Sequence, residues 1–131
     1  MTQISNLPAH KARNLIGQKK LSSTELVKSC IEQYEKHNPN INAIVAIDQK
    51  DVLEQAKKCD VKVSKGETLG LLHGLPVGIK DLQMVKNLRS TYGSLLFKNH
   101  IPKHDDNIVK NLREEGGLIF CKTNPPEFGA G

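Results

Sequence analysis

Apolar residues recur at helical spacing along much of this chain and predict several amphipathic helices. Residues 8–16 form a first short segment of this kind. A second helix begins at Ser22, because Ser22 and Glu25 match the capping-box pattern. We expect Asn38 and Pro39 to end this helix, since proline disfavours a helical conformation in the residue before it. Its predicted apolar face consists of Val27, Cys30, Ile31 and Tyr34.

Two more helices are predicted further along the chain. Asp48 is placed to cap the first of them, and the polar stretch 62–67 is predicted to be the surface loop that follows. The second spans residues 106–115, and Gly116 suits the left-handed conformation that commonly ends a helix. The predicted inward-facing residues of this helix are Ile108, Val109 and Leu112.

Short uncharged runs between the helices predict strands at 41–47, 77–80 and 118–121. Uninterrupted apolar runs are typical of strands buried on both faces. Helices that alternate with such strands favour an α/β fold, in which a mixed, at least partly parallel sheet is flanked by helices. No internal repeat or low-complexity stretch interrupts the pattern, so residues 1–131 are assigned to one domain.

Composition narrows the possible partners. The net charge of +5 comes almost entirely from lysines scattered along the chain, whereas nucleic-acid-binding surfaces gather basic residues on one face. With no Trp and few other aromatic residues to stack on bases, we expect no nucleic-acid partner. The three cysteines lack a Cys-x-x-Cys pair and suggest free thiols in a reducing compartment. Neither a signal peptide nor a membrane-spanning apolar run is recognisable, so the chain is predicted to be cytoplasmic, without a membrane partner.

Familiar catalytic and metal-binding patterns fail on spacing. Gly78 and Lys80 suggest a phosphate loop, but they are not adjacent and no Ser or Thr follows the lysine. His100 and His104 are four residues apart, yet Pro102 between them should prevent the helix that would bring both rings to one metal. The chain also has no Gly-x-Ser-x-Gly elbow. We therefore predict no metal site and no cofactor.

Lys80 occupies an unusual position at the end of an uncharged predicted strand. Burying a lysine cation costs free energy, so this side chain either extends beyond the strand end into solvent or is partly desolvated, which favours the neutral amine. The exposed alternative is the ordinary one for a lysine without further context.

Four motifs in the second half of the chain change that context. They are residues 72–81 (Leu-His-Gly-Leu-Pro-Val-Gly-Ile-Lys-Asp), 90–94 (Ser-Thr-Tyr-Gly-Ser), 106–112 with the glycine pair 116–117, and 122–131 (Lys-Thr-Asn-Pro-Pro-Glu-Phe-Gly-Ala-Gly). In this order they resemble the amidase-signature family, strongly over residues 69–131 and in helical pattern before that. The Leu-His-Gly opening and the final motif resemble general amidases more than the A subunit of glutamyl-tRNA amidotransferase. The resemblance implies a layered α/β fold of which residues 1–131 form an incomplete N-terminal portion.

The resemblance also implies a mechanism. In the family, a lysine deprotonates a bridging serine, which activates the nucleophilic serine that attacks an amide carbonyl. The motif places that lysine at Lys80, the one catalytic residue predicted here, and no substrate-binding residue is assigned. Both serines and the oxyanion-stabilising amides belong to a Gly/Ser-rich segment that residues 1–131 do not contain. In the completed enzyme, the other lysines of this region, Lys86 and Lys122, are predicted to tolerate replacement by Met with much smaller losses of activity than Lys80.

Two features of the last motif leave alternatives open. Cys121 stands where the family usually has glycine, and its side chain could crowd a close backbone approach. Lys122, Thr123 and Asn124 either line the substrate side or fix the conformation of their loop.

Three hypotheses follow. The leading one is an amidase-type hydrolase of small-molecule carboxamides that is cut short before its serines and is inactive alone. The second is a half-protein that a C-terminal partner chain completes. The third is a non-catalytic binding module that retains this part of the fold.

Overall fold

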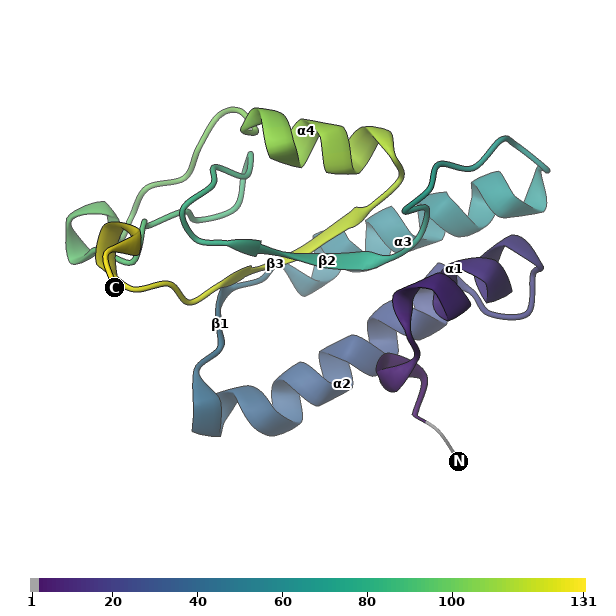
Figure 1. Ribbon diagram of the computed structural model, residues 1–131, viewed down its shortest axis with the longest axis horizontal. Coiled ribbons are helices and arrows are strands. Elements are labelled where there is room, and N and C mark those ends of the chain that lie inside the picture. The colour runs from purple at the N-terminus through teal and green to yellow at the C-terminus, as the bar shows by residue number, and fades with distance from the viewer. Residues whose placement is uncertain (1–2) are drawn as a thin grey trace.

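A computed structural model describes residues 3–131 and shows a three-stranded sheet with helices packed on both faces (Figure 1). In Figure 1, α4 covers one face, and α2 and α3 cover the other, with α1 beside α2. The helices and strands are α1 (Ala9–Gly17), α2 (Ser23–Ile41), β1 (Ile44–Ala46), α3 (Gln49–Ser64), β2 (Pro76–Lys80), α4 (Asn107–Glu114) and β3 (Leu118–Thr123). Three 3₁₀ turns are η1 (Ile4–Asn6), η2 (Leu95–Phe97) and η3 (Glu127–Gly129).

The sheet is mixed, as the sequence predicts. Its strand order is β1-β3-β2, with β2 parallel and β1 antiparallel to β3. The helical segment α4 connects the parallel pair, which is the usual way in which a chain returns to start a parallel neighbour. The predicted α/β class is therefore confirmed, and β2 and β3 end at the same edge of the sheet.

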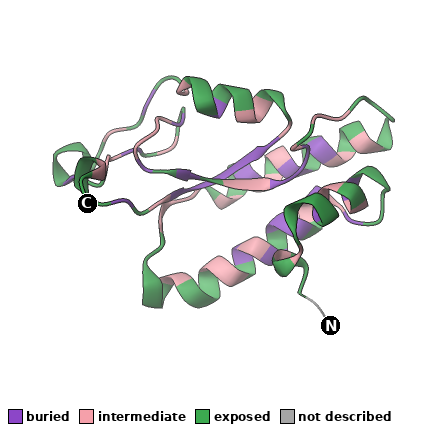
Figure 2. Ribbon diagram, in the orientation of Figure 1, coloured by how far each residue is buried: buried purple, intermediate pink, exposed green. Residues whose placement is uncertain are grey.

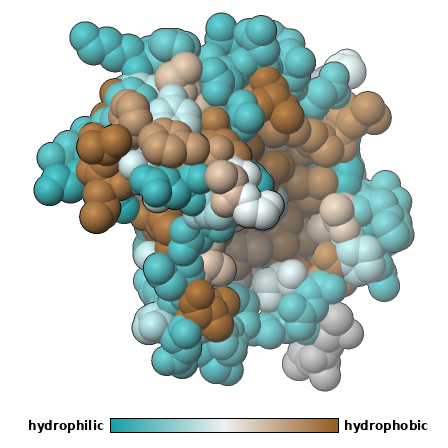
Figure 3. Space-filling model, turned by 60° about the vertical axis from the view of Figure 1, so that its left-hand side comes forward, coloured by the Kyte–Doolittle hydropathy of each residue, from teal (hydrophilic) through white to brown (hydrophobic). Residues whose placement is uncertain are grey.

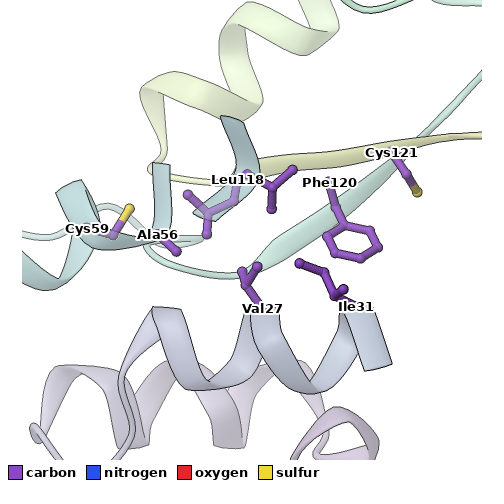
Figure 4. Close-up of a cluster of buried hydrophobic side chains, with 8 residues drawn as sticks. Val27, Ile31, Ala56, Cys59, Leu118, Phe120 and Cys121 are labelled. Atoms are coloured by element: carbon purple, nitrogen blue, oxygen red, sulfur yellow. The ribbon is translucent and has the colours of Figure 1, made fainter. Parts of the chain in front are cut away.

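Two apolar clusters hold the helices to the sheet. On one face, Leu118 and Phe120 of β3 pack with residues of α2 and α3, and Figure 4 shows the Phe120 ring directed at Ile31 of α2. On the other face, Ile119 of β3 packs with Val109 of α4. Figure 2 shows β3 buried along its length between these layers. Burial on both faces explains why the β3 sequence is a continuous apolar run.

The start of α2 follows the sequence prediction, and its end does not. The Ser22 hydroxyl accepts from the Glu25 N–H at 3.0 Å, and the Glu25 carboxylate accepts from the Ser22 N–H at 2.9 Å, so the capping box is formed. The predicted stop at Asn38 is wrong, because the helix continues through Pro39 to Ile41. The Asn38 side chain donates to and accepts from the backbone of Ile44, and this clamp holds the extra turn against the chain that leaves it.

Other elements also differ from the predictions. The first strand covers only Ile44–Ala46, a shorter stretch than predicted, and residue 41 belongs to α2 instead. The strand is half-buried because it lies at an edge of the sheet. Helix α3, capped by Asp48 as predicted, runs on to Ser64 and shortens the predicted loop. On α4, Val109 is buried and Leu112 half-buried, but Ile108 is exposed, so the predicted apolar face is one residue too wide. Gly116 has the predicted left-handed conformation, with φ of 84°.

A bulge in β3 reverses the alternation of its side chains. Val77 pairs with Ile119 and Ile79 pairs with Lys122, so β3 has one residue more than β2 between these pairs. Phe120 is the extra residue, and the side chains beyond it change face. Cys121, which could have crowded a close approach, pairs with Gly78, and even a Cβ built at Gly78 would lie 3.5 Å from the thiol sulfur, an ordinary contact distance. Cys121 is buried in the α2–α3 cluster, so the strand accommodates it.

Candidate active site

Lys80 is the last residue of β2, at the edge where both parallel strands end. Its side chain is exposed, whereas the residues on either side of it, Ile79 and Asp81, are 5% and 1% exposed. Because side chains alternate along a strand, burial of these two neighbours on one face directs Lys80 to the other. In residues 3–131, Lys80 therefore adopts the exposed alternative, and its amine is accessible to a group that approaches this edge.

Backbone hydrogen bonds fix the chain around Lys80. The Gln83 N–H donates to the Lys80 carbonyl at 3.1 Å and closes a tight turn, and the Asp81 N–H donates to the Thr123 carbonyl at 3.0 Å. The strand end therefore continues one residue beyond its named limit and is tied to β3. These bonds restrict the directions that the Lys80 side chain can take.

A buried polar cluster lies behind this turn. The Lys122 ammonium donates to Asp81 Oδ1 at 2.8 Å, to the Gln83 carbonyl at 2.6 Å and to the Ser90 hydroxyl at 2.7 Å. The Asp81 carboxylate also accepts from the backbone N–H and the hydroxyl of Thr91. Each of the three N–H donors of the ammonium thus has an acceptor, which is the condition for burying such a charge. We call these five residues the Lys122 cluster.

Lys122 lies inside the fold and not on its surface. Lys122 is 0% exposed and Asp81 is 1% exposed, so the lysine is an internal ion-pair partner and not a dispensable surface charge. Replacing it with Met would leave the Asp81 carboxylate buried without its cation. Burial lowers the pKa of Lys122 from its ordinary value, and the hydrogen bond and charge of Asp81 oppose that shift.

The remaining residues of the last motif fix its loop. Asn124 donates through its side chain to the Asn42 carbonyl at 3.0 Å and through its backbone N–H to the Ala43 carbonyl at 2.9 Å. Thr123 is half-buried and its carbonyl holds Asp81. Of the two alternatives that the sequence left open, these contacts favour the loop-fixing one.

The histidines singled out by spacing have separate environments. His100 Nδ1 lies 2.8 Å from the Ser90 carbonyl, and its ring stacks on Tyr92 with centroids 6.0 Å apart. His104 is exposed on the chain before α4. Across residues 3–131, no group of three or more His, Cys, Asp and Glu side chains is placed to hold a metal ion. In that same part of the chain, no helix is long and apolar enough to cross a membrane.

Apolar side chains gather beside the carboxyl end of β2. Leu95 and Leu96 on η2 are 85% and 84% exposed, and Phe97 packs edge-to-face on Phe128, with centroids 6.1 Å apart. Figure 3, turned to bring this end of the molecule forward, shows exposed brown side chains there. The turn η3 contacts the chain just after Lys80, since a Cβ built at Gly129 would lie 2.7 Å from the Leu82 side chain. Lys80 thus ends its strand close to an apolar surface.

A separate cleft of about 540 Å³ opens between the start of α3 and the loop of residues 85–88. Asp105 and Arg113, which form an ion pair of 2.9 Å, lie along it. Asp105 also accepts from the Lys86 N–H at 2.7 Å. The cleft contains neither Lys80 nor the Lys122 cluster, and its paired charges hold loop 85–88 against α4.

Burial controls the reactivity of the thiols. Desolvation raises the pKa of Cys121 to about 11 and also raises that of the half-buried Cys30. We expect iodoacetamide at neutral pH to alkylate Cys121 much more slowly than Cys30 in the folded chain and equally fast in urea, because the thiolate is the nucleophile. Peptide mass spectrometry measures both rates. Equal rates in the folded protein would show that Cys121 is not enclosed.

The raised pKa of Cys121 also makes the stability of the folded chain depend on pH. A thiol whose pKa is raised on folding stabilises the folded chain fully below its unfolded pKa, here 9.0 for Cys121, and loses that contribution as the pH rises towards about 11. The free energy of unfolding, measured in urea at several pH values across this range, should therefore fall less steeply with pH in Cys121→Ala, which cannot ionise at this position.

Comparison with known proteins identifies the family. The sequence profile of the Amidase family matches residues 25–131, so the chain belongs to the amidase-signature family. It is 37% identical over 127 residues to the A subunit of glutamyl-tRNA(Gln) amidotransferase from Clostridium botulinum (strain Eklund 17B / Type B), and 36% identical over 123 residues to the protein of the same name from Heliobacterium modesticaldum. The matches include 97% and 94% of this chain. The chain spans about a quarter of the length of these relatives, 26% and 25%, and matches their N-terminal part.

Solved structures support the same fold. A bacterial aryl acylamidase of the amidase-signature family matches 93% of this chain with a TM-score of 0.85 and 26% identity, and the chain covers 26% of it. The native peptide amidase from Stenotrophomonas maltophilia matches 94% of this chain with a TM-score of 0.85 and 25% identity, again over 26% of its own length. The sequence-based preference for general amidases is not supported by the curated relatives, which carry the amidotransferase name at higher identity.

Proposed function

We propose that this chain provides Lys80 as the general base of an enzyme that cleaves carboxamide C–N bonds. The main support is the position of Lys80 within the matched family segment, exposed at the carboxyl edge of a parallel strand pair between two buried neighbours. Ligands of open α/β sheets bind at this edge. The rigid turn after Lys80 adds the fixed geometry that a proton acceptor needs.

The proposed chemistry follows the amidase-signature mechanism. When the serine-bearing segment encloses Lys80, burial disfavours the cation and leaves a neutral amine. This amine takes the proton of a bridging serine, and that serine takes the proton of the nucleophilic serine as its oxygen attacks the amide carbonyl. The protons return by the same route to the departing nitrogen, which leaves as ammonia or an amine. Water then cleaves the acyl-serine ester, and no metal or cofactor takes part. Backbone N–H donors must stabilise the oxyanion in both steps.

We propose that residues 1–131 act as the N-terminal portion of one amidase domain. The chain's seven serines do not include the family's Gly/Ser-rich segment, so the two catalytic serines must come from other sequence, either joined to this chain or on a partner chain. The apolar side chains beside β2 and its unpaired edge offer surfaces on which such a segment could pack. The three free thiols suit a reducing compartment, which supports a cytoplasmic location.

Amide hydrolysis and amide-nitrogen transfer both fit this proposal, because each starts with attack on a carboxamide carbonyl. The curated relatives carry the amidotransferase name, and the solved structures include amidases. We propose a small-molecule carboxamide as the group that meets the serine, since the reaction common to both names requires one. Nucleic acid and membrane are not proposed as partners.

The experiment compares the chain alone with a fused enzyme. In the fused enzyme, residues 1–131 replace the matching N-terminal quarter of the Clostridium botulinum relative. We expect no ammonia release from carboxamides by the chain alone, since one base without nucleophile or oxyanion donors cannot carry out acyl transfer. The fused enzyme should release ammonia in a glutamate-dehydrogenase-coupled assay.

Two outcomes would contradict the proposal. Turnover by the chain alone that disappears in Lys80→Ala would show that the chain contains its own nucleophile. A folded fused enzyme without activity, beside an active parent relative, would favour the non-catalytic binding module. Mixing the chain with a separate serine-bearing part tests the half-protein hypothesis in the same assay.

A further inference from the structure

We propose that Lys122 is a positioning residue for Lys80, which it acts on through the buried turn after β2. The inference rests on the proposed role of Lys80. Lys122 makes no contact with the exposed face on which Lys80 lies, since its ammonium is fully buried. Its three acceptors all belong to the segment that follows Lys80, namely Asp81, Gln83 and Ser90.

The contacts of Lys122 hold both ends of the turn. At the first end, its ammonium binds Asp81, the residue bonded directly to Lys80. At the other end it binds the carbonyl of Gln83, whose N–H donates to the Lys80 carbonyl. The single ammonium therefore joins two residues that are tied to the Lys80 backbone, and movement of either would turn the Lys80 side chain.

By holding Asp81, Lys122 also determines on which face of the sheet the Lys80 side chain lies. Successive side chains of an extended chain point to opposite faces, so holding Asp81 with Ile79 on the α4 face keeps Lys80 on the other. Thr91 donates its hydroxyl to the other carboxylate oxygen of Asp81, Oδ2, and its N–H to both oxygens, which prevents rotation of the carboxylate away from Lys122.

The bulge in β3 is what brings Lys122 to this position. Ile119 and Lys122 pair with Val77 and Ile79, which share the α4 face. Without the extra residue Phe120, strict alternation would place residue 121 on that face and turn Lys122 to the other. Bulges near active sites re-aim individual side chains in this way. The bulge and the buried ion pair therefore form one device that sets the Lys80 backbone.

The test is a double-mutant cycle in the fused enzyme. We expect Lys122→Met to lower kcat at least about tenfold and to change KM by less than about twofold, because substrate contacts stay intact and the base is misplaced. In a Lys80→Met background the same change should have no further effect on kcat. Lys86→Met is the matched control, since Lys86 has an exposed side chain and should leave both constants unchanged.

Opposite results overturn the inference. An equal loss of kcat in both backgrounds, or a rise in KM with kcat unchanged, would give Lys122 a role that does not pass through Lys80. If Lys122→Met fails to fold, Ser90→Ala decides, because it removes one acceptor and keeps the ion pair. Ser90→Ala should lower kcat roughly two- to fivefold at unchanged KM, and it should have no further effect on kcat in the Lys80→Met background. An unchanged kcat in Ser90→Ala would refute the inference.

The cycle separates this inference from the proposed function. Activity retained by Lys80→Met would remove the proposed function itself. Activity lost by Lys80→Met but retained by Lys122→Met would remove the positioning role alone.

Discussion

Replacing Lys80 with Met in the fused enzyme is expected to lower kcat by about 10³-fold or more while the protein still folds. Met keeps much of the apolar stem and removes the amine, so the bridging serine loses its proton acceptor. Since Lys80 is exposed at the end of β2 and its fixed contacts use backbone atoms, the substitution should change stability little. Steady-state ammonia release and thermal unfolding measure the two effects.

Two further substitutions make the Lys80 result specific. Lys80→Arg should fail equally, because a guanidinium stays protonated and cannot act as a base. Lys86→Met, on the same segment, should retain normal rates. Near-full activity in Lys80→Met would mean that the motif has been aligned to the wrong lysine.

Replacing Lys122 with Met is expected to cause a larger loss of stability than replacing Lys80 or Lys86 with Met. The Asp81 carboxylate would stay buried without its cation. The Gln83 carbonyl and the Ser90 hydroxyl would also lose the hydrogen bond that the ammonium donates to each of them. Breaking a buried ion pair by removing one partner costs about 3–5 kcal/mol, a large part of the stability of an ordinary domain. Urea unfolding followed by circular dichroism measures the change.

A neutral replacement of the pair provides the control for that result. In Asp81→Asn/Lys122→Met, the Asn oxygen can still accept from Thr91, and its amide can donate to an acceptor that the lysine leaves free. Part of the lost stability should therefore return. A single Lys122→Met variant as stable as Lys86→Met would show that the ion pair is not buried as described.

Features with a local cause could be predicted from the sequence. The capping box at Ser22, the cap at Asp48 and the left-handed Gly116 each depend on residues within one turn, and all three are formed. The α/β class followed because continuous apolar runs alternated with amphipathic helices. The family resemblance, based on four ordered motifs, is confirmed by the profile match over residues 25–131.

Features that depend on distant contacts could not be predicted in the same way. The helix α2 passes Pro39 because the Asn38 side chain clamps Ile44, a contact that no propensity encodes. The sequence predicts a last strand that ends at Cys121, which places Lys122 at the start of a loop. A lysine that directly follows four buried apolar residues was the available signal, but its meaning required the bulge at Phe120, which brings it to Asp81 across the sheet.

Chemical rescue distinguishes a Lys80 that acts as a base from one that only supports the fold. Lys80→Ala in the fused enzyme leaves space where the lysine stem was, and a small primary amine such as ethylamine can supply the missing proton acceptor. If Lys80 is the base, ethylamine restores ammonia release from the amide in proportion to its free-base concentration, and does not do so in Lys122→Ala. Lys80→Ala with near-full activity in the absence of added amine would contradict the role of Lys80 as the base.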